Sequence, residues 1–422
     1  MHIAIIGNGV TGITAALRIR ERQPDWRITV ISGESKYHYS RPALMYIFMG
    51  HMRYEDTKPY EDHFWDEKRL NLVRAWVTKI DTQAKRLELH DREALSYDKL
   101  LIASGSQSNK FGWPGQDLDG VQGLWGLYDL KRLYDTAKRT RHAVIVGGGL
   151  IGIELAEMLH SRGIHVDFLV RESSYWNNIL PAEESGMINQ TIREAGLGLF
   201  LKTELKEIVD DGQGRVAGVI TNEDRMIDCQ MVGLTAGVSP NIELVRESPI
   251  ETARGILVDW QLRSSVEDVY AAGDCAELVT PGDDRNVIQQ VWYTGKMQGQ
   301  LVADSICGET CTYDPGLWFN SAKFLDLEYQ TYGKVNMRVP GEKNLFWRHP
   351  TEMIAVRIVH LEGIVIGLNL MGLRFRHEVC ERWLVEERTV DYVLAHLEEA
   401  NFDPEFFRRH EPTVRRALQE AL

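Results

Sequence analysis

The stretch Ile3-Ala4-Ile5-Ile6-Gly7-Asn8-Gly9-Val10-Thr11-Gly12 decides the fold. Its apolar run predicts a buried strand, residues 13–18 open an amphipathic helix, and residues 26–31 predict a second strand. In this context the Gly-x-Gly-x-x-Gly spacing indicates a dinucleotide site, because the glycines allow a tight turn and let the helix N-terminus approach a pyrophosphate. The predicted binding residues of this turn are Gly7, Gly9, Val10, Thr11 and Gly12.

The same pattern returns in the middle of the chain. Residues 143–146 predict a strand, residues 153–159 a helix and residues 165–170 the next strand. Between the first strand and the helix stands a second glycine turn, Gly147-Gly148-Gly149-Leu150-Ile151-Gly152. Two such units predict two dinucleotide sites in one chain. The predicted binding residues of the second turn are Gly147, Gly149, Leu150, Ile151 and Gly152.

An acidic side chain follows the first unit at a spacing typical of ribose binding. Glu34 stands 22 positions after Gly12, and the acidic residue that binds ribose hydroxyls follows such a turn at about 20 residues. The alternative is a solvated loop glutamate.

Length, charge and cysteine content restrict the class of protein. The 422 residues allow about three domains. The formal net charge of −13 disfavours broad contact with nucleic acid or with an anionic membrane.

The longest apolar stretch, residues 364–373, is far shorter than the roughly 20 residues of a spanning helix. The chain begins with a strand, so no leader is expected, and the few scattered cysteines favour a reduced, cytoplasmic protein. These cysteines are Cys229, Cys275, Cys307, Cys311 and Cys380.

Three further segments complete a resemblance to a known family. They are residues 96–106, residues 255–265 and residues 269–274 (Val-Tyr-Ala-Ala-Gly-Asp), which stand with the two glycine turns in the family's order. Over roughly the first 310 residues the chain resembles the flavoprotein reductases with two dinucleotide-binding domains, the pyridine nucleotide–disulfide oxidoreductase superfamily. The resemblance implies non-covalent FAD at the first turn and NADH or NADPH at the second. It adds as cofactor-binding residues Ser104, Gly105, Gly237, Gly273 and Asp274, whose carboxylate would bind the ribityl chain.

One branch of this superfamily is especially similar. Residues 39–44 (Tyr-Ser-Arg-Pro-Ala-Leu) resemble the flavin-side Arg-Pro-x-Leu loop of the ferredoxin, rubredoxin and nitrite reductases, which implies that Arg41 and Pro42 contact FAD. Trp292 opens a stretch similar to the one whose Trp flanks the isoalloxazine and the nicotinamide, where an aromatic face excludes water. The alternative for Trp292 is a core residue of a helix.

The family also implies which residues select the nicotinamide nucleotide. Arg171 and Glu172 end the strand after the second glycine turn. Arg171 suits a 2′-phosphate, Glu172 suits a free 2′-hydroxyl, and both are also compatible with solvent-exposed strand ends. We therefore expect dual use of NADH and NADPH.

The chain departs from the family at two positions with chemical consequences. Ala43 stands where some relatives place a redox cysteine, and no cysteine precedes Cys229, so a dithiol or sulfenate mechanism is not expected. The branch places a Lys where this chain has Tyr46, and that Lys pairs with the Glu that is present here as Glu154. Glu154, Tyr46 and Trp292 are the predicted catalytic residues, and Tyr46, Lys296 and Lys323 are candidates to replace the missing Lys.

These observations predict an α/β protein with two Rossmann-like dinucleotide-binding domains and a C-terminal α+β domain. The breaker cluster at residues 112–115 predicts a hinge between units. The predicted segments are 1–112 and 241–312 for the FAD-binding domain, 113–240 for the NAD(P)H-binding domain and 313–422 for the C-terminal domain.

No metal site is predicted. Cys307 with Cys311, and His377 with Cys380, have no further pair at zinc spacing. The segment at His349 resembles the His-Pro-Thr of glutathione reductase relatives, but it precedes residues 364–367 where theirs follows the equivalent strand, so that role is not assigned.

The predicted function is an FAD-dependent NAD(P)H oxidoreductase that passes electrons from its flavin directly to an acceptor, a small iron–sulfur protein of the ferredoxin or rubredoxin type. We expect a monomer or homodimer without nucleic acid or integral membrane association. One alternative is a slow-turnover flavoprotein redox sensor or scaffold, supported by the missing Lys. A second is a peripheral NADH:quinone reductase bound through a basic amphipathic tail. The tail residues are Phe406, Phe407, Arg408, Arg409, Val414, Arg415, Arg416, Leu418 and Leu422.

Overall fold

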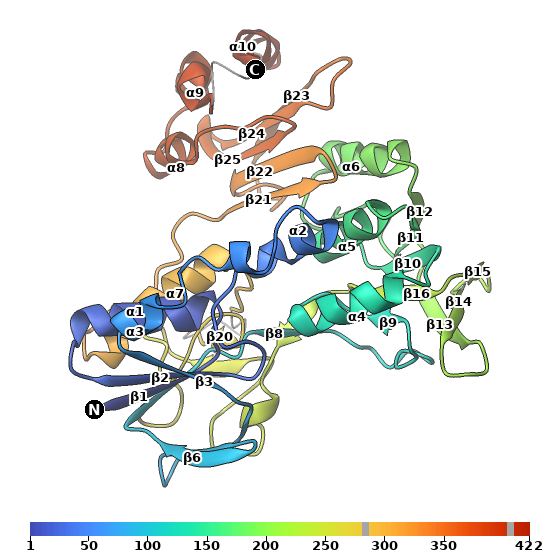
Figure 1. Cartoon of the computed structure of the whole chain (residues 1–422). Helices are drawn as coiled ribbons and strands as arrows, with labels where there is room; N and C mark the ends of the chain where they lie inside the picture. Colours follow the sequence, from blue (N-terminus) through green and yellow to red (C-terminus); the bar gives the residue numbers. More distant parts are fainter. Residues whose placement is uncertain (281–286, 403–408) are drawn as a thin grey trace. The chain divides into compact units, whose positions relative to one another are not determined.

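The computed structural model describes residues 1–280, 287–402 and 409–422 (Figure 1). The chain divides into two compact units, each built from separate segments. The first unit contains residues 1–111, 123–138 and 237–315, and the second contains residues 112–122, 139–236 and 316–422.

A five-stranded parallel sheet forms the centre of the first unit. Its core includes Ile5, Leu101 and Ala271, which are fully buried, as expected for strands covered on both faces. The order of the strands is β19 (Val269–Ala271), β7 (Lys99–Ile102), β1 (His2–Ile6), β2 (Arg27–Ser32) and β3 (Leu70–Arg74).

Two helices of the first unit approach each other closely. Helix α1 (Val10–Arg22) follows β1, and α7 (Trp292–Ile306) lies beside it (Figure 1). A Cβ at Gly299 of α7 would stand 2.6 Å from the carbonyl oxygen of Thr11. Glycine is therefore what allows α7 to approach the first turn of α1.

Smaller elements complete the first unit. Its helices and 3₁₀ turns are η1 (Arg41–Ala43), α2 (Leu44–Met49), η2 (Glu55–Thr57), α3 (Phe64–Glu67), α4 (Leu127–Ala137) and η3 (Glu243–Val245). One small sheet has the strand order β4 (Val77–Asp81), β5 (Arg86–Leu89) and β6 (Arg92–Ser96). Two further sheets pair β8 (Ser106–Ser108) with β17 (Val238–Pro240), and β18 (Ile256–Val258) with β20 (Ala276–Leu278).

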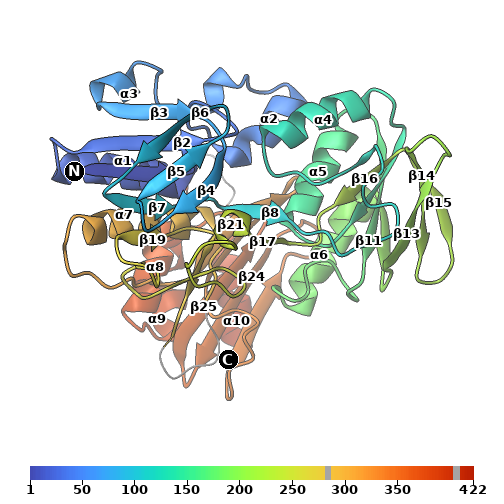
Figure 2. The same ribbon diagram turned by 90° about the horizontal axis from the view of Figure 1, so that it is seen from below.

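The second unit repeats the parallel arrangement. Its strands run in the order β12 (Gly198–Leu201), β11 (His165–Val170), β10 (His142–Val146), β16 (Met231–Leu234) and β9 (Val121–Gln122). Helices α5 (Leu150–His160) and α6 (Ala182–Glu194) follow β10 and β11. Figure 2 shows the antiparallel strands β13 (Leu205–Asp210), β14 (Val216–Thr221) and β15 (Met226–Asp228) next to this sheet.

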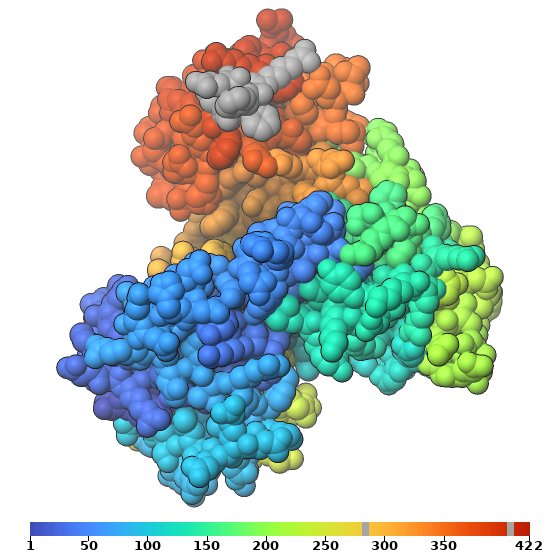
Figure 3. All heavy atoms as spheres, in the orientation of Figure 1, coloured from blue at the N-terminus to red at the C-terminus, as the bar shows by residue number. Residues whose placement is uncertain are grey.

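Residues 316–422, orange to red in Figure 3, add an antiparallel sheet and helices with a hydrophobic cluster of their own. In this cluster Ile358, Leu368 and Trp383 are fully buried. The strand order is β21 (Phe319–Phe324), β22 (Leu327–Gly333), β25 (Ile364–Met371), β24 (Ala355–Leu361) and β23 (Lys343–Arg348). The helices are α8 (His377–Val385), α9 (Val390–Ala395), η4 (Leu397–Ala400) and α10 (Glu411–Glu420).

A buried ion pair connects this antiparallel sheet to α6. Arg357 Nε of β24 donates to Glu184 Oε1 of α6 at 2.7 Å, and Asn369 Nδ2 of β25 donates to the same oxygen at 3.2 Å. Separating α6 from the sheet would leave a buried charge unpaired, which is strongly unfavourable. These contacts therefore hold α6 against the sheet.

The α/β fold class is confirmed, with two parallel sheets and an α+β C-terminal part. Both glycine-turn helices begin three residues earlier than the sequence pattern predicted, because Gly9 and Gly149 are themselves the N-cap residues. Within the described residues, no helix is both long and apolar enough to cross a membrane.

Candidate functional site

The first glycine turn leaves room for an anion at the start of α1. Gly7 has φ of +108°, and a Cβ there would overlap the carbonyl oxygen of Ala103. Gly9 caps α1 without a side chain, and a Cβ at this position would meet none of the described atoms within 4 Å. The first helical turn, residues 10–12, is uncharged. Its backbone N–H groups are thus available to a pyrophosphate, so the residues present fit the phosphate part of FAD.

The second glycine turn has the same construction in the second unit. Gly147 has φ of +123°, and a Cβ there would stand 2.6 Å from the carbonyl oxygen of Thr235. Gly149 caps α5, again with open space around its Cα. The buried Tyr175 hydroxyl donates to the carbonyl oxygen of Gly149 at 2.8 Å, which fixes the turn. This N-terminus therefore fits the pyrophosphate of a nicotinamide nucleotide.

Glu34 lies in a network of hydrogen bonds rather than in solvent. Its Oε1 accepts from the Tyr39 hydroxyl at 2.6 Å and from the backbone N of Leu127, at the start of α4, at 2.8 Å. Arg41 Nη2 donates to its Oε2 at 2.5 Å, and Arg41 Nη1 donates to the carbonyl oxygen of Trp125 at 2.9 Å. Glu34 and Arg41 thus join the loop after β2 to the start of α4. Pro42 is the second residue of η1, which begins at Arg41. The alternative of a solvated loop glutamate does not describe Glu34, whereas ribose binding stays a prediction.

Asp274 lies beside the first glycine turn with one oxygen already oriented. Ser106 Oγ donates to Asp274 Oδ2 at 2.9 Å, and Gln290 Nε2 donates to Ser106 Oγ at 2.8 Å. A Cβ at Gly273 would stand 2.5 Å from Thr11 Oγ1, so glycine lets the Asp274 segment approach α1. Burial raises the pKa of Asp274, against the opposing effects of Ser106 and the Arg41 charge.

Sequence reasoning did not identify Ser106 and Gln290 as part of this site. Ser106 ends the segment 96–106 that supported the family resemblance, so its position was a usable signal. Gln290 stands 184 residues away in sequence and carries no motif of its own. In the same segment, Ser104 Oγ donates to the carbonyl oxygen of Asn241 at 2.7 Å. Just after this segment, the backbone N of Asn109 donates to the carbonyl oxygen of Gly237 at 3.1 Å.

Glu154 lies on α5 among charged neighbours. Lys323 Nζ of β21 donates to Glu157 Oε1 at 2.6 Å, one helical turn after Glu154. Burial, followed by the Glu157 charge, raises the pKa of Glu154 to about 7, and the Lys323 charge acts in the opposite direction. Of the three candidates for the missing Lys, Lys323 belongs to the same unit as Glu154, whereas Tyr46 and Lys296 belong to the first unit.

The two predicted aromatic catalytic residues lie in the first unit. Trp292 is the first residue of α7 and is 52% exposed, with Lys296 Nζ 5.6 Å from the centre of its ring. The alternative of a core tryptophan therefore does not describe Trp292. Tyr46 lies on α2, and its ring stacks on His51 with centres 6.3 Å apart. Their catalytic roles stay predictions.

Arg171 and Glu172, the residues predicted to select the nicotinamide nucleotide, form an ion pair with each other. Arg171 Nε donates to Glu172 Oε1 at 2.8 Å, and the Arg171 side chain is 74% exposed. The pairing raises the pKa of Arg171. An adjacent carboxylate thus offsets part of the attraction that Arg171 would exert on a 2′-phosphate.

The cysteines are poor candidates for redox chemistry. All five lie within the described residues as free thiols, and Cys229, Cys275 and Cys380 are buried. Burial raises the pKa of the Cys229 thiol to about 12, and it also raises the pKa of Cys307 and Cys311. Because the thiolate is the reactive form, these environments disfavour thiol chemistry.

The C-terminal helix does not present the apolar face that membrane binding requires. Val414 and Leu418 of α10 are buried in the hydrophobic cluster of residues 316–422. Arg415 Nε donates to the carbonyl oxygen of Leu394 at 2.7 Å. Phe406, Phe407 and Arg408 lie outside the described residues. The described part of the tail therefore does not support the quinone reductase alternative.

Comparison with known proteins agrees with this geometry. The family described as pyridine nucleotide-disulphide oxidoreductase matches residues 1–299. Rhodocoxin reductase of Rhodococcus erythropolis is 30% identical over 326 residues, which cover 77% of this chain and 76% of that protein. The ferredoxin–NAD(+) reductase subunit of the benzene 1,2-dioxygenase system of Pseudomonas putida is 29% identical over 310 residues, which cover 73% of this chain and 75% of that protein.

A solved structure supports the fold over the whole length. The NAD-dependent persulfide reductase from A. fulgidus superposes with a TM-score of 0.86 at 22% identity, covering 100% of this chain and 83% of that one. The match over residues 1–299, together with a relative at 30% identity, shows that this chain belongs to the pyridine nucleotide-disulphide oxidoreductase family and is an oxidoreductase that uses FAD and a nicotinamide nucleotide.

Proposed function

We propose that this oxidoreductase passes electrons from its flavin directly to a small iron–sulfur protein, without a thiol relay. The observation that carries the proposal is the state of the cysteines. Burial raises the pKa of Cys229, Cys307 and Cys311, and Ala43 stands where the resemblance implies a redox cysteine in some relatives. An acceptor must then meet the flavin itself. Two relatives are named as reductases of rhodocoxin and of a ferredoxin, which supports an iron–sulfur partner.

The first unit would hold FAD through complementary contacts. The open N-terminus of α1 at Gly9 would receive the pyrophosphate. Asp274, oriented by Ser106, would accept hydrogen bonds from the ribityl hydroxyls. When bound, FAD supplies hydride acceptance and electron release in single or paired steps.

The second unit would hold the nicotinamide nucleotide. The N-terminus of α5 at Gly149 would receive its pyrophosphate, and Arg171 with Glu172 would meet its adenosine ribose. Because Arg171 and Glu172 pair, we propose that both NADH and NADPH are accepted. Glu154, whose pKa is about 7, would hold or release a proton in the working pH range.

A comparison of electron acceptors, each mixed separately with the reduced enzyme, tests the proposal. The FAD-loaded enzyme, reduced anaerobically with NADH, is mixed in a stopped-flow instrument with an oxidised [2Fe–2S] ferredoxin, an oxidised rubredoxin or a water-soluble quinone. We expect flavin reoxidation by an iron–sulfur protein with a rate that saturates with its concentration and falls with salt, as for electrostatically guided pairs. Faster reoxidation by the quinone, or slow reoxidation by every acceptor, would reject the iron–sulfur assignment.

A further inference from the structure

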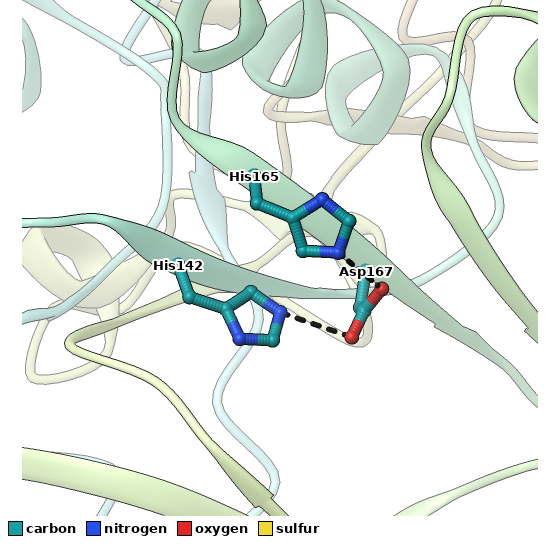
Figure 4. A group of neighbouring side chains, drawn as sticks. All are labelled: His142, His165 and Asp167. Atoms are coloured by element: carbon teal, nitrogen blue, oxygen red, sulfur yellow. Dashed lines mark hydrogen bonds and ion pairs between the residues drawn. The ribbon is translucent and has the colours of Figure 1, made fainter.

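We propose that His142, His165 and Asp167 form a binding site for a divalent transition metal of the zinc type in the second unit (Figure 4). His142 and His165 are the first residues of β10 and β11. The glycine turn follows the other end of β10, a strand length of about 16 Å away at 3.3 Å per residue. The metal would thus be separate from the nucleotide site.

The parallel register of two strands brings the three side chains together. His142 pairs with His165, and Val144 pairs with Asp167. Because side chains alternate along a strand, His165 and Asp167 project from the same face, and His142 shares that face as a cross-strand neighbour. Figure 4 shows both imidazoles directed at the Asp167 carboxylate.

The distances suit a metal ion. His142 Nε2 lies 2.9 Å from Asp167 Oδ2, and His165 Nε2 lies 3.3 Å from Asp167 Oδ1. The three ligand atoms all lie within 4.8 Å of one another. A tetrahedral zinc ion with bonds of about 2.0–2.2 Å holds neighbouring ligand atoms about 3.3 Å apart. Both nitrogen–oxygen separations are near this value, although they end on different oxygens of the carboxylate. A cation in the cluster would therefore replace the hydrogen bond between His142 and Asp167.

The ligand types select the class of metal. Two imidazole nitrogens and one carboxylate oxygen suit zinc, cobalt or nickel, whereas calcium and magnesium take mainly oxygen ligands. The His165 side chain is 55% exposed and the Asp167 side chain 10% exposed. A cation would therefore enter from the solvent side at His165, and water would complete its coordination.

The surroundings are matched to the carboxylate. Gly198 pairs with Asp167 on the adjacent strand β12, and a Cβ at Gly198 would overlap Asp167 Oδ1. On the other side, Gln230 Oε1 accepts from the backbone N of His142 at 3.2 Å, which fixes the start of β10. The Gln230 contact fixes the backbone of His142, and the missing side chain at Gly198 leaves room for the Asp167 carboxylate. Both features are present without a cation.

A second group of metal-type ligands within the described ranges serves as a comparison. It consists of His349, Glu352 and His410. Here the imidazole-to-carboxylate separations are 3.9 and 4.0 Å, and His349 Nδ1 already accepts from the backbone N of Glu352 at 2.9 Å. The wider spacing makes this group the weaker candidate and a suitable control.

The test is a zinc titration of the FAD-loaded, full-length protein by isothermal titration calorimetry, after EDTA treatment and dialysis. The parent protein should bind one zinc ion per chain at this site. His165→Gln changes a side chain that is more than half exposed and should keep the fold, yet weaken zinc binding at least about tenfold because a direct ligand is lost. Asp167→Asn should have a similar effect. The matched controls, His349→Gln and the double change Cys307→Ser with Cys311→Ser, should leave the affinity unchanged.

X-ray absorption at the zinc edge gives an independent measurement, because the site predicts nitrogen and oxygen ligands without sulfur. Undetectable zinc binding by the parent at submillimolar zinc, unchanged binding in His165→Gln, or a sulfur shell would overturn the proposal. FAD content and flavin reduction by NADH should stay at the parent level in His165→Gln, so failure of the metal site is distinguishable from failure of the proposed function.

Discussion

Lys323 of β21 donates to Glu157 of α5 across 2.6 Å, and this ion pair lies one helical turn from Glu154. The resemblance to the ferredoxin and rubredoxin reductases implies a lysine as the partner of this glutamate, at the position that Tyr46 occupies in this chain. Here a lysine from the C-terminal sheet places its charge near Glu154, and burial still raises the pKa of Glu154 to about 7. The Lys323 charge, which comes from a strand far from α5 in sequence, therefore opposes the larger effects of burial and of Glu157 on the pKa of Glu154.

Replacement of Glu154 by Gln should stabilise the protein at alkaline pH. Below the ordinary pKa of 4.5 the carboxyl group is neutral in the folded and unfolded chain. As the pH rises through 4.5 towards about 7, the unfolded chain ionises first, so the parent loses stability that Glu154→Gln retains. The gain above pH 7 should reach about 2–4 kcal/mol at 1.36 kcal/mol per pKa unit. Melting temperatures at pH 5 and pH 8 measure it.

Lys323 provides the control for this prediction. Lys323→Met removes the charge that lowers the pKa of Glu154, so the pH midpoint of the stability change should move upwards, and Lys323→Arg should restore it. A Glu154→Gln variant whose advantage is the same at both pH values would contradict the raised pKa.

Asp274→Ala should weaken FAD binding. The ribityl hydroxyls would lose a charged acceptor, at a cost of about 1.5–3 kcal/mol, or roughly 10–150-fold in the dissociation constant. Ser106→Ala removes the donor that orients Asp274, and its smaller cost should be about 0.5–1.5 kcal/mol. The FAD dissociation constants of both variants are measured from the fluorescence of free FAD that is released on dilution.

Gln107 is the matched control for these two variants, because it lies next to Ser106 on β8 with an exposed side chain. Gln107→Ala should bind FAD like the parent. If Asp274→Ala also binds FAD as tightly as the parent, the ribityl assignment is wrong.

Glu172→Ala should improve the use of NADPH. Removal of the carboxylate frees Arg171 to bind a 2′-phosphate, and a charge-assisted bond is worth about 1.5–3 kcal/mol, so the KM for NADPH should fall by up to about 100-fold. Arg171→Ala should raise the KM for NADPH and leave that for NADH nearly unchanged. Steady-state kinetics with an artificial acceptor measure both; equal effects on the two nucleotides would show that Arg171 is a solvated strand end.

Removal of the cysteines should leave turnover nearly intact. Ser replaces the partly exposed Cys307 and Cys311. Ala replaces the buried Cys229, Cys275 and Cys380, where a buried hydroxyl would need a hydrogen-bond partner. Flavin reduction by NADH should stay within a few-fold of the parent rate, measured on protein with full FAD content. A large loss of rate in this folded variant would reveal a thiol that takes part in the reaction.

Local patterns in the sequence were sufficient for the fold class and the glycine turns. Residues 3–12 and 143–152 each contain a strand, a turn and the start of a helix. The spacing of their glycines predicts the turn, because a tight turn and a close approach of the backbone require glycine. The start of each helix was predicted three residues late, because residues 10–12 and 150–152 belong to the glycine motif as well as to the first helical turn.

Contacts between segments far apart in the chain could not be predicted from the sequence. Lys323 and Glu157 are 166 residues apart, and Ser106 and Gln290 are 184 apart, so no local pattern connects them. The cluster of His142 with Asp167 depends on the register of two parallel strands. Spacing rules for metal ligands do not include this arrangement, because the ligands come from the starts of neighbouring strands.

In the proposed reaction, electrons pass through one flavin and no thiol. An anaerobic titration of the FAD-loaded protein with NADH, followed by the flavin absorbance near 450 nm, distinguishes this route from a thiol relay. We expect complete bleaching at one NADH per FAD, because the flavin alone accepts the two electrons. A requirement for two NADH per FAD, or a long-wavelength thiolate-to-flavin band, would contradict it.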